Sequence, residues 1–302
     1  MSTTPADAEP CLVCGGTEHD VLYPSTYSGS VEQAPHYFLA HRTATAHGRI
    51  VRCRACGFVF TSPRFSDGEY DQIYKSIPSP ALLDPSFARA NRARLGRLAG
   101  VVRKHAQGQP ELLDFGCGDG SFLEVLASPA ARGFEIGAPG TRRAGPSEII
   151  TGDWSQVAGS PAIPAGSFDV VTAFDVLEHL PRIKQDLASI HAVLKPGGLF
   201  FASVPNIASW IARAMGPRWT MLLLEHLWYF SPATMRRFMA AQGFHMLEWR
   251  GVPYDAPLSH LTTRVLQVFG QRGTWRGGAA SQIVLPVPAG LMLGVFRRAN
   301  PE

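Results

Sequence analysis

Leu112-Leu-Asp-Phe-Gly-Cys-Gly-Asp-Gly-Ser-Phe122 is an apolar run that ends in three alternating glycines. Residues 111–115 predict a short buried strand, and residues 121–127 predict the helix that follows it. A glycine-rich turn between a strand and a helix offers a ligand backbone N–H groups and close approach to the backbone. The stretch therefore predicts an α/β fold with a nucleotide-like ligand at this turn.

The spacing of the glycines excludes two common nucleotide-binding loops. The dinucleotide fingerprint needs Gly or Ala three residues after the second glycine, where this chain has Ser121. The phosphate loop of ATPases and GTPases needs Gly-Lys followed by Ser or Thr, and this loop contains no lysine. What remains is Asp114-x-Gly116-x-Gly118-x-Gly120, in which the acid suits a ligand that carries an ammonium group and no pyrophosphate.

This motif resembles the first motif of the class I S-adenosylmethionine-dependent methyltransferases, and four further segments follow in that family's order. They are the strand ending at Glu135, the strand leading to Asp153-Trp154, the strand 168–174 with Asp175-Val-Leu-Glu178-His179 after it, and the turn 194–198 before the strand 199–204. Glu135 follows Asp114 by 21 residues, where an acid can accept hydrogen bonds from both ribose hydroxyls. The resemblance implies a seven-stranded, mostly parallel, Rossmann-like sheet.

The resemblance also implies which residues bind S-adenosylmethionine. Trp154 either stacks on the adenine or is a core tryptophan, and the sequence leaves both alternatives open. Residues 137–146 are rich in glycine and proline where the family has a helix, so we expect that helix to be short or missing. The expected cofactor-binding residues are Asp114, Phe115, Gly116, Gly118, Gly120, Glu135, Asp153, Trp154 and Phe174.

Two Cys-x-x-Cys-Gly segments, beginning at Cys11 and Cys53, precede the glycine loop. This spacing lets two thiolates at one tight turn face a common point, and two such turns complete a tetrahedral zinc site. A redox dithiol and unrelated core cysteines are the alternatives, but metal is the expected use in a cytoplasmic chain. Four thiolates leave no open coordination position, so we expect a structural zinc on Cys11, Cys14, Cys53 and Cys56.

We expect three parts: a zinc-ribbon module at 1–64, a helical linker with a basic face at 65–108, and a methyltransferase domain at 109–302. Within the last, the apolar insertion 205–230 is expected to act as a lid, because ligands bind beyond the carboxyl ends of strands in open α/β sheets. Its aromatic residues alternatively just cover the sheet. The linker cations are either a solvated helix face or an attraction for a phosphorylated or nucleotide-linked acceptor. They are Arg89, Arg92, Arg94, Arg97, Arg103 and Lys104.

The segment Glu225-His226-Leu-Trp-Tyr229-Phe, followed by a helix that starts at Ser231-Pro232, resembles the methyltransferase branch that modifies small molecules and sugars. Methyl transfer is an in-line displacement at a sulfonium, so the enzyme aligns the acceptor, and a hydroxyl or carbon acid must also lose a proton. Histidine accepts protons near neutral pH. His226 is therefore the expected general base and His179 the second candidate, although each alternatively has only a structural hydrogen bond. Tyr229 is an expected acceptor contact.

Composition limits the partners. The 302 residues are 45% hydrophobic and carry a net charge of +4, which is too small to indicate a nucleic-acid partner. We expect no membrane span and no secretory signal, and hence a cytoplasmic enzyme. The expected acceptor is a sugar, free or nucleotide-linked, or a natural-product intermediate, methylated at a hydroxyl, amine or carbon acid. The rivals are a zinc-ribbon scaffold protein and a methyltransferase for tRNA or protein; the oligomeric state is not predicted.

Overall fold

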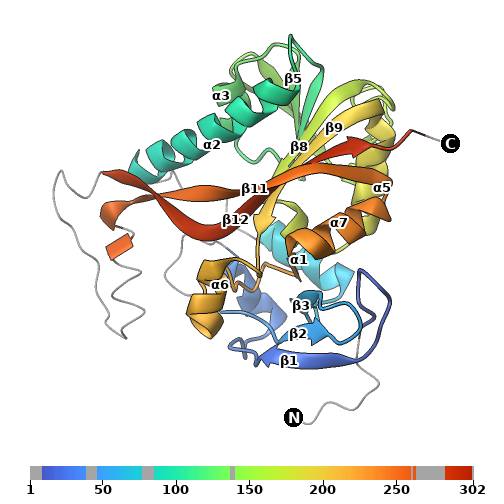
Figure 1. Cartoon of the computed structure of the whole chain (residues 1–302). Coiled ribbons are helices and arrows are strands. Elements are labelled where there is room, and N and C mark those ends of the chain that lie inside the picture. Colours follow the sequence, from blue (N-terminus) through green and yellow to red (C-terminus); the bar gives the residue numbers. More distant parts are fainter. Residues whose placement is uncertain are drawn as a thin grey trace.

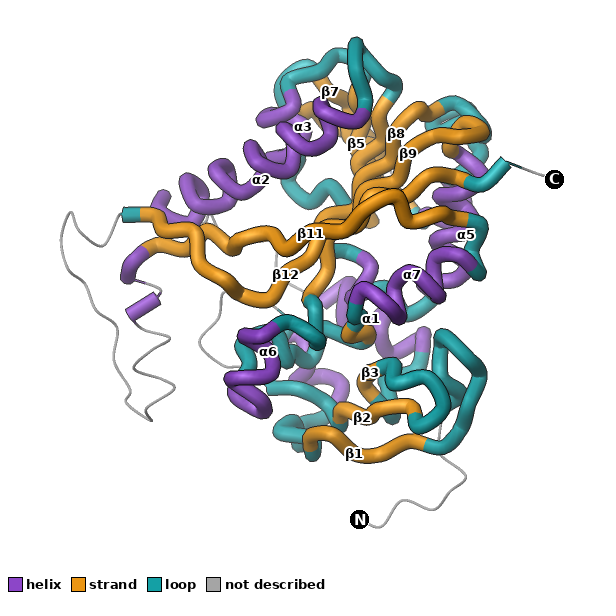
Figure 2. The backbone as a smooth tube through the Cα atoms, viewed as in Figure 1, coloured by secondary structure: helices purple, strands orange, loops and turns teal. Residues whose placement is uncertain are grey.

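The computed structural model describes residues 9–38, 46–76, 85–136, 140–259, 261–262 and 283–300. Within these ranges the strands form two sheets, one with the order β11-β12-β9-β8-β4-β5-β7-β6 and one with the order β1-β2-β3-β10. Figure 1 shows the larger sheet above the smaller one, with α6 (Trp210–Met215) beside the junction between them. Figure 2 shows the same division, with helices on the outside of the larger sheet.

The centre of the larger sheet is parallel, as the sequence predicts. Each of its strands pairs in parallel with the next, from β9 through β8, β4 and β5 to β7. The side chains of β4 are all buried because helices cover both faces of the sheet. The bounds are β9 (Leu194–Pro205), β8 (Phe168–Phe174), β4 (Leu112–Phe115), β5 (Ala131–Ile136) and β7 (Ser147–Gly152).

Both edges of this sheet are antiparallel. On one side β12 (Val284–Arg298) pairs with β9, and β11 (Phe244–Pro257) forms the outer strand. On the other side β6 (Gly140–Ala144) forms a hairpin with β7. The predicted count of seven strands is wrong, because the described sheet has eight. The glycine- and proline-rich segment that replaces a helix turns at Gly145, with φ 58°, and adds β6.

Helices cover the two faces of the larger sheet. On one face lie α2 (Pro85–His105) and α3 (Ser121–Leu126), where Leu98 and Leu123 belong to one apolar cluster with Leu293 of the sheet. On the other face lie α5 (Ile183–Val193) and α7 (Pro232–Ala240), whose apolar residues join a second cluster. The short helix α4 (Trp154–Val157) follows β7. None of the helices in the described ranges has the length and hydrophobicity needed to cross a bilayer.

The smaller sheet combines the N-terminal segment with part of the predicted lid. Its N-terminal strands are β1 (His19–Tyr23), β2 (Ile50–Cys53) and β3 (Val59–Thr61). The short strand β10 (Trp228–Tyr229) pairs antiparallel with β3, so that Trp228 lies opposite Phe60. Stacked and tilted rings of Phe58, Phe60, Trp228 and Phe230 fill this junction. The N-terminal segment and residues 205–230 therefore share one sheet and one apolar core.

The remaining elements connect these layers. Ser209 caps α6 by accepting a hydrogen bond from the Ala212 N–H, and Ser231 caps α7 by accepting one from the Thr234 N–H. The predicted start of a helix at Ser231-Pro232 is thus confirmed. The other helices are η2 (Val31–Tyr37), α1 (Asp67–Ser76), η3 (Leu177–His179) and η4 (Gly216–Arg218).

Candidate functional site

The glycine loop joins β4 to α3, where the sequence predicts it. Gly116, Gly118 and Gly120 all have positive φ, at 72°, 55° and 88°. A Cβ at Gly116 would lie 2.7 Å from the Val176 side chain, and one at Gly120 would lie 2.4 Å from Ala144. Positive φ and these close contacts require glycine at both positions. The loop therefore brings bare backbone against the segment that follows β8.

Glu135 ends β5 beside this loop. Its Oε2 accepts a hydrogen bond of 2.5 Å from the Gly118 N–H, and its Oε1 accepts one of 3.1 Å from the Ile136 N–H. Burial raises the pKa of this carboxyl, while the Gly118 hydrogen bond opposes the rise. Arg142 of β6 donates to the carbonyl oxygens of Gly118 and Asp119 from the other side. The carboxylate and the loop are thus held together as one unit.

Asp114 lies beneath the loop and is 3% exposed. Its Oδ1 accepts a hydrogen bond of 2.6 Å from the Thr172 hydroxyl of β8. Burial raises the pKa of Asp114 to about 7, because a carboxylate without a nearby cation is costly in an apolar environment. A ligand ammonium at this point would supply the missing positive charge.

The predicted aromatic cofactor contacts lie mostly in the core. Trp154 is 4% exposed, and its ring lies 4.7 Å from that of Phe115 and 4.8 Å from that of Phe134. This packing corresponds to the core alternative that the sequence left open. Phe174 is half-buried and meets Phe122 edge to face. Asp153 is exposed and caps α4, because its Oδ1 accepts a hydrogen bond from the Ser155 N–H.

The sequence did not predict the ion pair between Arg94 of α2 and Asp175 at the end of β8. Asp175 has φ 56°, a left-handed conformation that is rare outside glycine, and its backbone N–H and side chain both bond Ser203. Arg94 is 9% exposed, and its Nη1 has no hydrogen-bond partner among the described residues. Asp175 adjoins Val176, the residue that contacts Gly116, so this orphaned donor lies next to the loop.

Two other predicted cations of α2, Arg97 and Arg103, also have partners in the fold. Arg97 pairs with Asp255 of β11, and Arg103 donates to the carbonyl oxygen of Leu126 at 3.0 Å. The only signal for these contacts in the sequence was the helical spacing of the arginines, since their partners are far along the chain. The helix thus fastens the linker to the larger sheet.

His179 and His226 lie together, although they are 47 positions apart in the chain. Their ring centroids are 4.8 Å apart. The His179 Nδ1 is 3.0 Å from the Glu225 carbonyl oxygen, and the His226 Nδ1 is 2.8 Å from the Met221 carbonyl oxygen. Burial lowers the pKa of His179 to about 4 and that of His226 well below its usual range. Both imidazoles are therefore neutral near pH 7.

Two buried carboxyls, Glu178 and Glu225, adjoin the histidines and were not singled out as site residues by the sequence. Glu178 is 1% exposed, and its Oε2 has no hydrogen-bond partner among the described residues. Burial, and then the nearby Asp175, raise the pKa of Glu178 well above its usual range. Burial raises the pKa of Glu225 to about 8. The repeated Glu-His pair, at 178–179 and at 225–226, was the signal that the sequence offered.

The third predicted catalytic residue, Tyr229, is fully buried within β10. Its hydroxyl donates to the Leu223 carbonyl oxygen at 3.4 Å, and burial raises its pKa. The structure brings His226 and His179 together and places Tyr229 behind His226, with ring centroids 6.2 Å apart. Their catalytic roles stay predictions.

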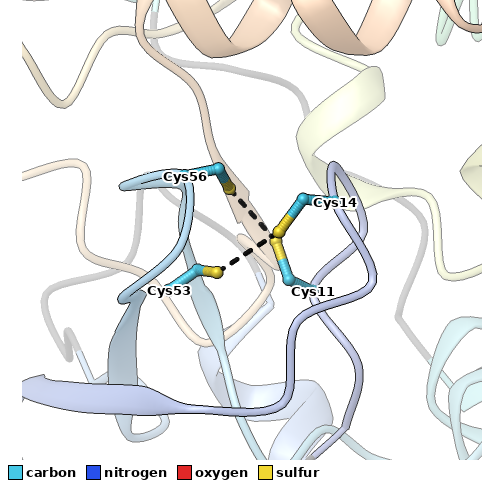
Figure 3. Close-up of side chains that lie close together, drawn as sticks. All are labelled: Cys11, Cys14, Cys53 and Cys56. Carbon is cyan, nitrogen blue, oxygen red and sulfur yellow. Dashed lines mark hydrogen bonds between the residues drawn. The ribbon is translucent and has the colours of Figure 1, made fainter.

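The four predicted zinc ligands also come together (Figure 3). The Sγ atoms of Cys11 and Cys56, and those of Cys14 and Cys53, are each 3.5 Å apart. Zn–S bonds of about 2.3 Å place thiolates about 3.8 Å apart in a tetrahedron, so this set fits zinc closely. Gly15 and Gly57 have φ 76° and 73°, as expected for the two tight turns. All four thiols are free rather than disulfide-bonded.

Two cavities lie outside the loop itself. One of about 470 Å³ is lined by Asp169, Lys195 and Gly198. Asp169 lies at the N-terminal end of β8, so this cavity lies at the end of the sheet away from the glycine loop. The other, of about 440 Å³, lies between the N-terminal strands and the predicted lid and is lined by Thr61, Tyr70 and Leu224. Leu224 is the member of this lining that comes from residues 205–230, and the others belong to the N-terminal segment.

Comparisons with known proteins give a consistent result. A family model described as a methyltransferase domain matches residues 81–248. A ubiquinone biosynthesis O-methyltransferase of Cupriavidus pinatubonensis is 27% identical over 185 residues, which are 57% of this chain and 73% of the relative. The Burkholderia multivorans enzyme of the same name is 29% identical over 160 residues, or 47% and 67% of the two chains.

Solved structures give a weaker likeness. The Burkholderia thailandensis 1,6-didemethyltoxoflavin-N1-methyltransferase, with bound S-adenosylhomocysteine, is 16% identical. The match covers 82% of this chain and 98% of that one, with a TM-score of 0.49.

Proposed function

Because the chain belongs to the methyltransferase family whose domain its residues 81–248 match, we propose that it methylates a hydroxyl group of a small molecule. The methyl donor is S-adenosylmethionine. The observation that carries the proposal is the unit of Glu135 and the glycine loop, held by the hydrogen bond from the Gly118 N–H. This unit offers a carboxylate to ribose hydroxyls beside a backbone that a ligand can approach closely.

We place the amino-acid end of the donor between Asp114 and Arg94. Asp114 is a buried carboxyl without a cation, which suits the ligand ammonium. Arg94 has an orphaned buried N–H group beside the same loop, which suits the ligand carboxylate. An unpaired donor and an uncompensated acid are costly in a core, and this one ligand satisfies both.

The acceptor end lies past the carboxyl end of β8, where Glu178, His179, Glu225 and His226 gather. A hydroxyl acceptor is favoured by the relatives, which are O-methyltransferases. It is also favoured by the neutral imidazoles of His179 and His226, which can accept the proton that a hydroxyl loses. The cavity beside Leu224 gives room for a small molecule. The predicted sugar or natural-product acceptor has no support from the comparisons, and neither does a phosphorylated one.

We further propose that Cys11, Cys14, Cys53 and Cys56 hold a structural zinc. The support is the spacing of their sulfur atoms and the absence of disulfides at these cysteines. The zinc-ribbon module at 1–64, the linker at 65–108 and the catalytic domain at 109–302 remain our division of the chain, with 205–230 as the lid. In this division β3 ends at Thr61 within the module, α1 and α2 fall in the linker range, and β10 of the lid adds a strand to the sheet of the module.

A methyl-transfer assay tests the proposed function. Purified protein is incubated with S-adenosylmethionine and a panel of phenols, catechols, sugars, amines and unmodified tRNA, and S-adenosylhomocysteine formation is measured. We expect turnover with a hydroxyl compound, strong loss in Glu135→Ala, and no loss in Glu148→Ala, an exposed acid on β7. Turnover only with tRNA would favour the macromolecular rival, and turnover only with amines would refute the O-methylation.

A further inference from the structure

Glu178, His179 and His226 form a second group of potential metal ligands, apart from the four cysteines. One ligand atom of each lies within 4.8 Å of the other two. Glu178 and His179 come from η3 after β8, and His226 comes from the segment before β10. The group thus spans the donor-binding domain and the predicted lid.

The hydrogen bonds of the two rings fix where their lone pairs are. A backbone carbonyl oxygen can only accept a hydrogen bond, so Nδ1 of each neutral ring carries the hydrogen that it donates to Glu225 or Met221. Nε2 of each ring is then unprotonated and has a free lone pair. A backbone carbonyl bonded to Nδ1 is the arrangement that orients metal-binding histidines in proteins.

The third member, Glu178, supplies an orphaned acceptor. Its Oε2 is buried and has no hydrogen-bond partner among the described residues. Two further carboxyls, Asp175 and Glu225, act electrostatically on Glu178, against the single guanidinium of Arg94. Arg94 is already paired with Asp175. Nε2 of each histidine and Oε2 of Glu178 thus offer three lone pairs at one place. The described side chains there do not supply enough positive charge to balance the carboxyls.

The backbone carbonyl oxygens of the three residues accept hydrogen bonds from separate elements, and these bonds hold the cluster in place. The Leu227 N–H donates to the Glu178 carbonyl oxygen at 2.8 Å, and the Tyr74 hydroxyl donates to that of His179 at 3.1 Å. The Thr61 hydroxyl of β3 donates to the His226 carbonyl oxygen at 3.0 Å. The backbone that carries the three ligands is therefore held in place before any ion binds.

We propose that Glu178, His179 and His226 bind a divalent transition-metal ion, with zinc as the first choice, at the acceptor end of the active site. Two imidazoles and one carboxylate suit zinc and leave a coordination position open, unlike the four-cysteine site. Ligand bonds of about 2.0–2.2 Å place tetrahedral ligand atoms about 3.4 Å apart, so binding draws the three side chains together. This inference rests on the proposed function for the nature of the acceptor.

The open position is where the acceptor hydroxyl binds. A bound cation lowers the pKa of that hydroxyl, whose proton passes to water. The oxygen's electron pair then forms the bond to the methyl carbon, and the carbon–sulfur pair returns to sulfur, which leaves S-adenosylhomocysteine. With the ion bound, His179 and His226 are ligands, and the metal then replaces the role in proton acceptance that the sequence predicts for His226 and that the proposed function gives to the neutral imidazoles.

Cobalt substitution of the full-length protein tests the site, because the two donor sets differ in their spectra. Thiolate–cobalt charge transfer reports the cysteine site, and metal analysis counts all bound ions. We expect about two ions per chain in the unaltered protein and about one in Glu178→Gln and in His226→Ala, with the thiolate signal retained. His245→Ala, an exposed histidine of β11, should keep about two.

A single ion per chain with a full thiolate signal in the unaltered protein would overturn the proposal, as would two ions in both cluster variants. The retained thiolate signal and calorimetric binding of S-adenosylmethionine show that each variant is folded. Binding of S-adenosylmethionine without a second metal refutes the metal site and leaves the proposed function intact. Binding of a second metal without binding of S-adenosylmethionine supports the metal site and refutes the proposed function.

Discussion

The hydrogen bond between Thr61 and His226 connects the N-terminal sheet to the predicted lid, and Thr61→Val tests whether the two act as one unit. Thr61 is 4% exposed and His226 is 5% exposed, so the hydrogen bond between them is buried. Valine keeps the shape of threonine, which leaves no cavity, and the Thr61 N–H keeps its bond to the Leu227 carbonyl oxygen. The change therefore removes the hydroxyl that serves the His226 carbonyl oxygen and that also interacts with the Tyr229 side chain.

An unsatisfied buried acceptor costs about 1–3 kcal/mol, so the free energy of unfolding should fall by that amount. Denaturant titration followed by circular dichroism measures it. We expect the acceptor KM to rise because residues 225–227 shift, while the Kd for S-adenosylmethionine stays unchanged. Thr61→Ser, which retains the hydroxyl, should restore both stability and KM.

Unchanged stability and unchanged acceptor KM in Thr61→Val would show that the N-terminal sheet does not position the acceptor end. A raised Kd for S-adenosylmethionine with an unchanged acceptor KM would also contradict the reasoning, because the Thr61 hydrogen bonds go to residues 226 and 227 and not to the glycine loop.

Three further predictions concern the donor site and the zinc. Arg94→Gln should weaken S-adenosylmethionine binding about 10- to 150-fold in calorimetry, since a hydrogen bond to a charged group is worth about 1.5–3 kcal/mol; an unchanged Kd would remove Arg94 from the site. The affinity should fall below about pH 7, where Asp114 becomes protonated and loses its attraction for the ligand ammonium. Asp114→Asn should remove this fall of affinity at low pH, and a pH-independent Kd in the unaltered protein would contradict the role of Asp114. Chelation of the zinc should unfold the N-terminal sheet and expose Phe58 and Phe60, detectable by proteolysis, and an unchanged digestion pattern would count against a structural zinc.

Local patterns in the sequence predicted much of the fold. Three elements were predicted because their signals lie in residues close together in the chain. They are the strand before Gly116, the strand that ends at Glu135 and the helix that starts at Ser231. β6 was missed because the glycine- and proline-rich composition of residues 137–146 indicates only that the family's helix is short or missing, and not that a hairpin takes its place. The pairing of β10 with β3 joins residues far apart in the chain, and nothing in either short segment indicates it.

The candidate site was predicted in part for the same reason. The glycine loop, Asp114 and the paired cysteines have characteristic spacing, and the structure brings each set together. Arg94 looked like one cation among six on a helix, because its partner Asp175 comes much later in the sequence. The sequence left two alternatives for Trp154, adenine stacking and a place in the core, because they differ only in packing. The structure places the ring against Phe115 and Phe134.

Calorimetric titration with S-adenosylmethionine tests the central claim most directly. The account predicts one binding site per chain in the unaltered protein, strong weakening in Glu135→Ala, and no binding of NADH. Absence of S-adenosylmethionine binding, or an affinity that Glu135→Ala leaves unchanged, would contradict it.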